Sequence, residues 1–192
     1  MKIDSIRRAI RFAGLVLPLT WAPGSVEGQS FGVGVTTATV NQKAPSAVLP
    51  AGGAMAQDQA SDVSVAGMVT AQDAFAIATD VMSSATLGTV SILNGLITAN
   101  GVVAMASSTI ENSNAEGSSL ANLVVNGVDL SDPAPNTRVD LPGVGYVVLN
   151  ERIATGDGIT VNMIHVVLQQ PVLGGYQTTG NIIVGSASSS VN

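Results

Sequence analysis

Apolar and small residues alternate with polar residues over short runs along most of the chain, which is the period-two pattern of half-buried β-strands. The clearest pattern occurs twice: residues 67–78 and 95–106 align at an offset of 28, with bulky apolar residues replaced like for like. In the second copy, Asn100 and Gly101 separate two runs of β-formers, and both residue types tolerate the positive φ of a type I′ turn. Gln72 and Asp73 hold the equivalent place in the first copy. The pattern predicts a β-hairpin in each copy.

A hairpin with a two-residue turn divides the side chains of each copy between two faces, because opposite residues share a side of the sheet. One face carries the bulky side chains, namely Met68, Thr70, Phe75 and Ile77 in the first copy and Leu96, Thr98, Val103 and Met105 in the second. The other face is rich in alanine: Val69, Ala71, Ala74, Ala76 and Ala78, and Ile97, Ala99, Val102, Ala104 and Ala106. We expect the bulky face to be the core face, so that Phe75→Asp unfolds the domain and Ala76→Ser is nearly silent. The alanine face is expected either to meet solvent or to let a second backbone approach closely.

The remaining turn signals predict further short strands. They indicate a strand over residues 31–40, a polar turn over 111–119, strand character over 120–130 with a turn at Asn126 and Gly127, an edge strand over 137–141, a hairpin over 146–168 with a loop at 154–158, and a last strand over 181–187 before a polar tail. About nine to eleven short strands without a convincing helix predict an all-β fold, an antiparallel β-sandwich or a barrel-like fold.

The connection after the first strand is long and rich in proline and glycine, from residue 41 to residue 60. We expect the first strand either to cross through it to a distant position in the same fold or to be donated to a neighbouring molecule. Residues 29–60 then form an N-terminal strand and loop, and residues 61–192 form the main body of a single β-rich domain, 29–192.

The first 28 residues have the organisation of a secretory signal peptide. Lys2, Arg7, Arg8 and Arg11 precede an apolar run over residues 13–22, and small residues stand before a cut after Gly28. The apolar run is shorter than the roughly 20 residues of a permanent membrane span. We therefore expect a bacterial protein that is exported, secreted or extracellular, with no transmembrane segment once the signal peptide is removed.

Composition narrows the classes of function. Residues 29–192 hold three strong bases and eleven acids, which leaves a formal charge of −8, and only 3% of the whole chain is aromatic. Such a surface predicts no nucleic-acid partner. The chain has no cysteine, which excludes disulfides and thiolate chemistry. Low charge and high β-propensity leave strand edges poorly defended, so self-association is an expected property.

Several segments carry a resemblance to a known family. They are residues 31–35, 48–53, 120–127, 135–143, 147–151, 161–165 and 183–187. In these segments, which follow the signal peptide and span essentially the whole mature chain, the protein resembles the choice-of-anchor P family of bacterial secreted and surface proteins. The resemblance implies a secreted or surface-associated protein and no particular activity. The C-terminal sorting signals for which the family is named have no counterpart before Asn192.

Few residues offer catalytic chemistry. His165 is the only histidine, and the predicted hairpin places it on the apolar face of Val147, Leu149, Met163 and Val167, as a residue of the core or an interface. The chain has too few His or Cys residues to bind zinc. We assign no catalytic or cofactor-binding residue.

The acidic residues are the remaining candidates for a site. Asp129, Asp132 and Asp157 lie in loops and have the oxygen ligands that calcium takes, but their spacing is typical of solvated turns, so we assign no metal site. The spacing of Glu111, Glu116 and Glu151 does not define an acid and base pair. Arg138 and Arg152 are expected to pair with nearby carboxylates.

The sequence therefore favours a non-catalytic secreted or cell-surface-associated protein with a structural or adhesive role, able to self-assemble. The alternative is a secreted calcium- or carbohydrate-binding module, or a hydrolase with a site of loop carboxylates.

Overall fold

The computed structural model describes residues 26–191, and in these residues it contains strands and no helix. The longer strands are β1 (Val26–Thr37), β2 (Asn41–Val48), β3 (Met55–Val65), β4 (Val69–Thr79), β5 (Met82–Ile92), β6 (Ile97–Ser108), β11 (Thr137–Leu141), β12 (Gly145–Ala154), β13 (Gly158–Val172) and β14 (Gly175–Val191). Four strands have two residues each: β7 (Ser113–Asn114), β8 (Ser119–Leu120), β9 (Val124–Val125) and β10 (Val128–Asp129).

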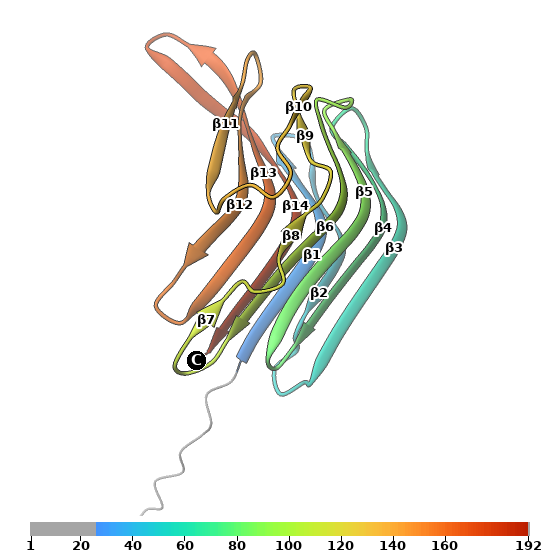
Figure 1. Cartoon of the computed structure of the whole chain (residues 1–192), viewed down its shortest axis with the longest axis vertical. Coiled ribbons are helices and arrows are strands. Elements are labelled where there is room, and N and C mark those ends of the chain that lie inside the picture. Colours follow the sequence, from blue (N-terminus) through green and yellow to red (C-terminus); the bar gives the residue numbers. More distant parts are fainter. Residues whose placement is uncertain (1–25, 192) are drawn as a thin grey trace, which may run out of the picture.

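These strands form two antiparallel sheets that pack face to face as a sandwich (Figure 1). The first sheet has the order β11-β12-β13-β14-β1-β2, and the second has the order β10-β9-β6-β5-β4-β3, with β7 and β8 also paired to β6. The predicted all-β fold is confirmed, and of the two predicted architectures the sandwich is the one formed. The core lies between the sheets; its largest fully buried side chains include Ile92, Ile97, Leu123, Leu141, Leu149, Met163, Ile164 and Ile182.

The first and last strands of the described chain lie side by side. β1 pairs with β14 along its whole length and with β2 on its other side. β1 therefore pairs within its own molecule, but a short turn leads from it into β2 in place of the predicted long connection. The predicted signal peptide lies outside the described residues, except for residues 26–28, which begin β1.

The predicted long loop over residues 41–60 is wrong, because β2 and the start of β3 occupy it. β2 lies at the edge of the first sheet, and only two of its eight residues are buried, so it needs no alternation of apolar side chains. The last strand is also longer than predicted. Its polar end, residues 188–191, becomes strand because β1 and β13 pair with it on both sides.

The two predicted hairpins of the repeat are wrong: β4 and β6 are each one continuous strand, and they flank β5 on opposite sides. A type I′ turn requires positive φ at two successive residues. At each predicted turn only one of the two residues has it, Asp73 with φ 52° and Gly101 with φ 87°, so the chain bends there and continues. By contrast, Asn126 and Gly127 have φ 49° and 77° and form the predicted turn, between β9 and β10.

The single left-handed residue shifts the inward and outward alternation of each strand by one. In β6, Ile97 and Ala99 are buried before Gly101, and Val102, Ala104 and Ala106 are buried after it. The predicted grouping of residues into two faces is therefore correct. A two-residue turn and a bend at one residue both place Ala99 and Val102 on the same face. The predicted choice of core face is wrong: the alanine face is buried, and Phe75 and Ile77 on the bulky face are half-buried.

The alanine face lies inward because the opposite sheet comes very close to it. A Cβ atom added to Gly32 of β1 would lie 3.3 Å from the Cβ of Ala74, and one added to Gly28 would lie 3.5 Å from the Cβ of Ala78. Larger inward side chains on β4 would force the sheets apart. The expectation of a close backbone approach on the alanine face is met by the partner sheet of the same molecule.

The first sheet bends in the same way as the second. Asn150 of β12 has φ 49° and Gly185 of β14 has φ 64°, and the pairing register places both opposite Met163 of β13. Figure 1 shows the long strands of both sheets bent along their length. This row of irregular residues decides which polar side chains of the first sheet point outward.

Candidate functional site

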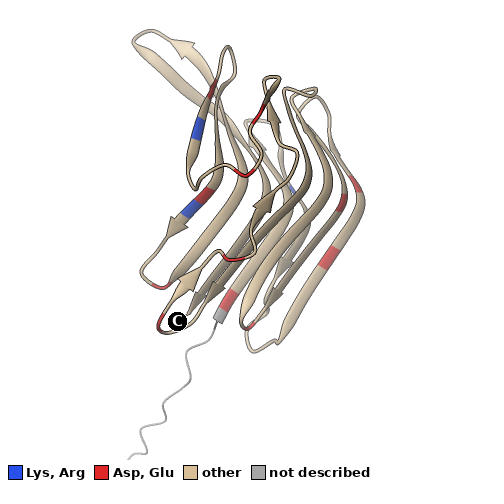
Figure 2. Ribbon diagram, in the orientation of Figure 1, with Lys and Arg blue, Asp and Glu red and all other residues tan. Residues whose placement is uncertain are grey.

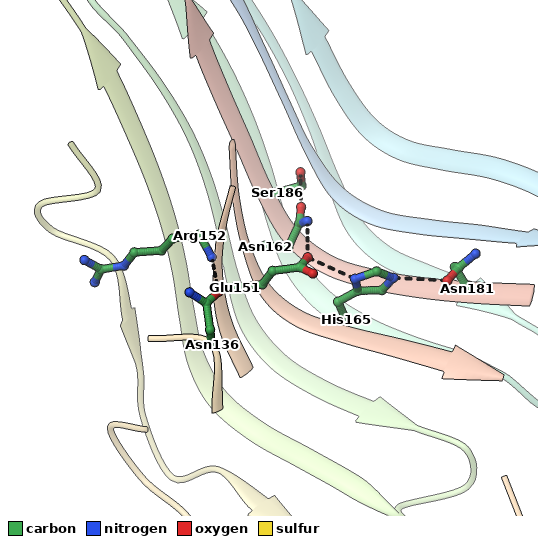
Figure 3. Close-up of polar contacts among 7 residues, drawn as sticks. All are labelled: Asn136, Glu151, Arg152, Asn162, His165, Asn181 and Ser186. Carbon is green, nitrogen blue, oxygen red and sulfur yellow. Dashed lines mark hydrogen bonds and ion pairs between the residues drawn. The ribbon is translucent and has the colours of Figure 1, made fainter. Parts of the chain in front are cut away.

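Five polar side chains meet on the outer face of the first sheet (Figure 3). Glu151 comes from β12, Asn162 and His165 from β13, and Asn181 and Ser186 from β14. Register brings them together, because Glu151 lies opposite Asn162, and Asn162 lies opposite Ser186. We call these five residues the outer polar cluster.

The bend at Asn150 turns Glu151 outward. Leu149 is fully buried against the second sheet, and in a regular strand Glu151, two residues later, would point the same way. The left-handed conformation of Asn150 shifts the alternation, so the carboxylate reaches the outer face. There 17% of the Glu151 side chain remains exposed.

Hydrogen bonds connect all five members. His165 Nδ1 lies 2.9 Å from Glu151 Oε2, and His165 Nε2 lies 3.1 Å from Asn181 Oδ1. Asn162 Nδ2 donates to the same Glu151 oxygen at 2.7 Å. Ser186 Oγ donates to Asn162 Oδ1 at 2.7 Å. The cluster is a continuous chain of contacts across three strands.

The contacts of His165 determine its charge. Both ring nitrogens face oxygen atoms, an arrangement that suits an imidazolium, which carries an N–H on each nitrogen. The hydrogen bond to Glu151 raises the pKa of His165, against the opposing effect of burial. Burial acts to raise the pKa of Glu151, but the hydrogen bonds from His165 and Asn162 prevail and lower it.

This arrangement does not form a nucleophile with a base. A general base needs a free lone pair within reach of the hydroxyl that it activates. Both nitrogens of His165 are engaged, and the Ser186 hydroxyl donates to Asn162. The cluster holds together three strands of the first sheet.

The predicted surroundings of His165 are wrong for three of the four residues, and only Val167 lies on the same side of β13. Val147, Leu149 and Met163 are buried toward the second sheet, whereas His165 lies opposite Val148 and points outward with the cluster. The bend at residues 150 and 163 separates these faces, and simple alternation in the sequence does not reveal it.

The charged pair predicts a dependence of stability on pH. The raised pKa of His165 stabilises the folded protein at pH values below 6.5, the ordinary pKa of this group. This stabilisation is lost as the pH rises through the pKa of the folded state. The lowered pKa of Glu151 stabilises the folded protein at pH values above 4.5, the ordinary pKa of this group. This stabilisation is lost as the pH falls through the pKa of the folded state. We expect Glu151→Gln to lower the free energy of unfolding by about 1–2 kcal/mol near pH 5.5 and by less near pH 9, measured by urea unfolding.

An exposed carboxylate serves as the control. Asp140 pairs with Arg138 at 3.1 Å, but its side chain is 79% exposed. Asp140→Asn should leave stability unchanged within error at both pH values. Equal losses for Glu151→Gln at pH 5.5 and pH 9 would contradict the assigned charge of the pair.

The two arginines differ in their partners. Arg138 pairs with Asp140, as predicted, and its guanidinium lies 3.8 Å from the centre of the Tyr146 ring. The pairing predicted for Arg152 is wrong, because its Nε donates to the amide oxygen of Asn150 at 3.2 Å. Charged residues are sparse over the described chain (Figure 2).

The loop carboxylates do not come together. Asp129 accepts hydrogen bonds from the amide and the hydroxyl of Ser131, which lower its pKa. Within residues 26–191, no group of three or more His, Cys, Asp or Glu residues is placed to hold a metal ion, so Asp132 and Asp157 join no such group. Glu111 and Glu116 belong to the segment that runs from β6 to β8, whereas Glu151 lies on β12.

Asn162, Asn181 and Ser186 were not predicted as site residues. Their signal was available, because Asn162 and His165 interrupt an apolar run and Asn181 precedes another. Joining them to Glu151 required the register of three strands.

Comparisons with protein-family models, with curated proteins and with solved structures found no match to this chain. Residues 26–191 contain no helix that is long and apolar enough to cross a membrane.

Proposed function

We propose that this protein is a non-catalytic structural or adhesive β protein, secreted or associated with the cell surface, and able to self-assemble. The observation that carries this proposal is the state of the outer polar cluster. Its histidine uses both nitrogens and its serine hydroxyl donates to an amide, so these groups serve the framework.

Two features of the sequence support the location in this proposal. The first 28 residues have the organisation of a signal peptide, and the mature segments resemble the choice-of-anchor P family. Low charge on long strands leaves sheet edges open to pairing with another chain, which agrees with self-assembly.

A substrate screen tests the absence of catalysis. The purified protein, His165→Gln and Ser186→Ala would be incubated with chromogenic esters, glycosides and peptides. We expect no turnover that distinguishes the unmodified protein from the two variants, because neither residue is free to activate a nucleophile. Turnover that is lost in His165→Gln, with an unchanged circular dichroism spectrum, would overturn the proposal.

A further inference from the structure

The β13–β14 hairpin extends beyond the strands that flank it. β12 begins at Gly145, opposite Leu168, and β1 ends at Thr37, opposite Gly180. Beyond these points the two strands continue as a ribbon that projects from the sandwich (Figure 1). All residues from 170 to 179 are exposed. Both outer edges of this ribbon therefore lack a neighbouring strand within the described molecule over most of its length.

The projecting ribbon carries no charge. No acidic or basic residue occurs between residues 166 and 192. Its tip is apolar, with Val172 43%, Leu173 107% and Tyr176 74% exposed. In a chain with a formal charge of −6, this is a region where a second copy can approach with little repulsion.

The other long outer edges carry protective features. β3 carries Asp58 and Asp62. β2 lies beside β3, and its Ser46 amide donates to Asp58 Oδ2 at 2.9 Å. β11 carries Arg138 and Asp140. Charges and covered backbone amides are known means of preventing edge-to-edge pairing.

Within the ribbon, the two edges differ. On the β13 edge, Pro171 lacks an amide hydrogen, and the amide of Gln169 already donates to Val144 O at 2.7 Å. On the β14 edge, residues 175–179 contain neither proline nor charge. The β14 edge is therefore the open one.

Register indicates which backbone groups face this edge. In an antiparallel pair, successive residue pairs direct their backbone groups alternately toward each other and outward. Gln169 lies opposite Thr178 and donates outward, so the backbone groups of Thr178 also point outward, as do those of Tyr176 two residues before.

We propose that two copies of this protein pair through residues 175–179 of β14, antiparallel and about a two-fold axis, so that the first sheets of both become continuous. The inference rests on the self-assembly in the proposed function and names its surface. A second copy supplies the strand that the open edge lacks. A lipid phase fits less well, because hydrocarbon offers no partner for the outward N–H and C=O groups of the ribbon.

Sedimentation velocity over a series of protein concentrations tests the pairing. We expect the unmodified protein to shift from monomer to dimer as concentration rises. Thr178→Pro removes an outward amide hydrogen without removing a hydrogen bond to β13, and Thr178→Lys places one positive charge from each copy on the same face of the interface. Each should raise the dissociation constant about tenfold or more, since the interface contains the change twice.

Matched controls separate edge pairing from general effects. Thr155→Lys adds the same charge in the exposed loop between β12 and β13, at the other end of β13, and should leave the dissociation constant unchanged. Circular dichroism and melting temperature should be the same for all four proteins. A monomer at every concentration, or dimerisation of Thr178→Pro equal to that of the unmodified protein, would overturn the inference.

Two further outcomes are distinguishable. Binding of a monomer to phosphatidylcholine vesicles that is lost in Leu173→Gln would assign the ribbon to lipid and overturn pairing between copies. Hydrolytic activity that depends on His165 would overturn the proposed function while leaving the sedimentation result intact.

Discussion

Replacement of Ala76 by aspartate is expected to unfold the protein. Ala76 is fully buried on the inward face of β4, between Ala74 and Ala78, which lie close to glycines of the opposite sheet. A carboxylate there would lack both water and a partner, and the added atoms would push against the opposite sheet. We expect the free energy of unfolding to fall by more than about 3 kcal/mol, a large part of the roughly 5–15 kcal/mol of a typical domain.

The adjacent residue provides the control. Phe75 lies on the outer face and is half-buried, so Phe75→Asp should cost about 1–2 kcal/mol and leave a folded protein. Urea unfolding followed by circular dichroism compares the two variants. A folded Ala76→Asp beside an unfolded Phe75→Asp would show that the bulky face is the core after all.

Gly185→Val is expected to be nearly as damaging. Gly185 has φ 64°, a conformation that costs an L-residue roughly 1–2 kcal/mol, and more when the side chain is β-branched. A Cβ atom at this position would also lie 2.7 Å from Val102 Cγ1 of the second sheet. Strain and overpacking together should lower stability by about 3–5 kcal/mol, measured as a shift of the urea midpoint.

Gly156 provides the matched control for this substitution. It lies in the exposed loop between β12 and β13, and a Cβ atom there would meet nothing within 4 Å. Gly156→Val should change stability by no more than about 0.5 kcal/mol. A similar loss for both variants would mean that the bend at Gly185 is not required for the packing of the sheets.

The outer polar cluster shows how the bends serve the molecule. A regular β12 would direct Glu151 toward the core, where a carboxylate would be costly to bury. The left-handed Asn150 places it beside His165 and Asn162 instead, where its Oε2 atom accepts hydrogen bonds from both side chains. The same bend that shapes the sheet therefore keeps the charge out of the core.

The sequence predicted an element correctly where neighbouring residues determine its conformation. The turn at Asn126 and Gly127, the edge strand β11 between prolines, and the loop between β12 and β13 were all predicted from residue types at those positions. The grouping of the repeat into an alanine face and a bulky face was also correct. Each of these depends on backbone preferences or on period-two alternation, which neighbouring residues determine.

Only the tertiary structure decided which face was buried and whether the chain turned or bent. Asn100 and Gly101 can form a turn, but β5 and β8 pair with β6 on either side of the bend and keep it extended. The sequence defined two faces of β4 and β6. The alanine face of β4 is buried by the close approach of β1 at Gly28 and Gly32, and that of β6 by β14 at Gly185. The outer polar cluster likewise required the register of β12, β13 and β14. Alternation is a property of one strand, whereas burial depends on what another strand places against it.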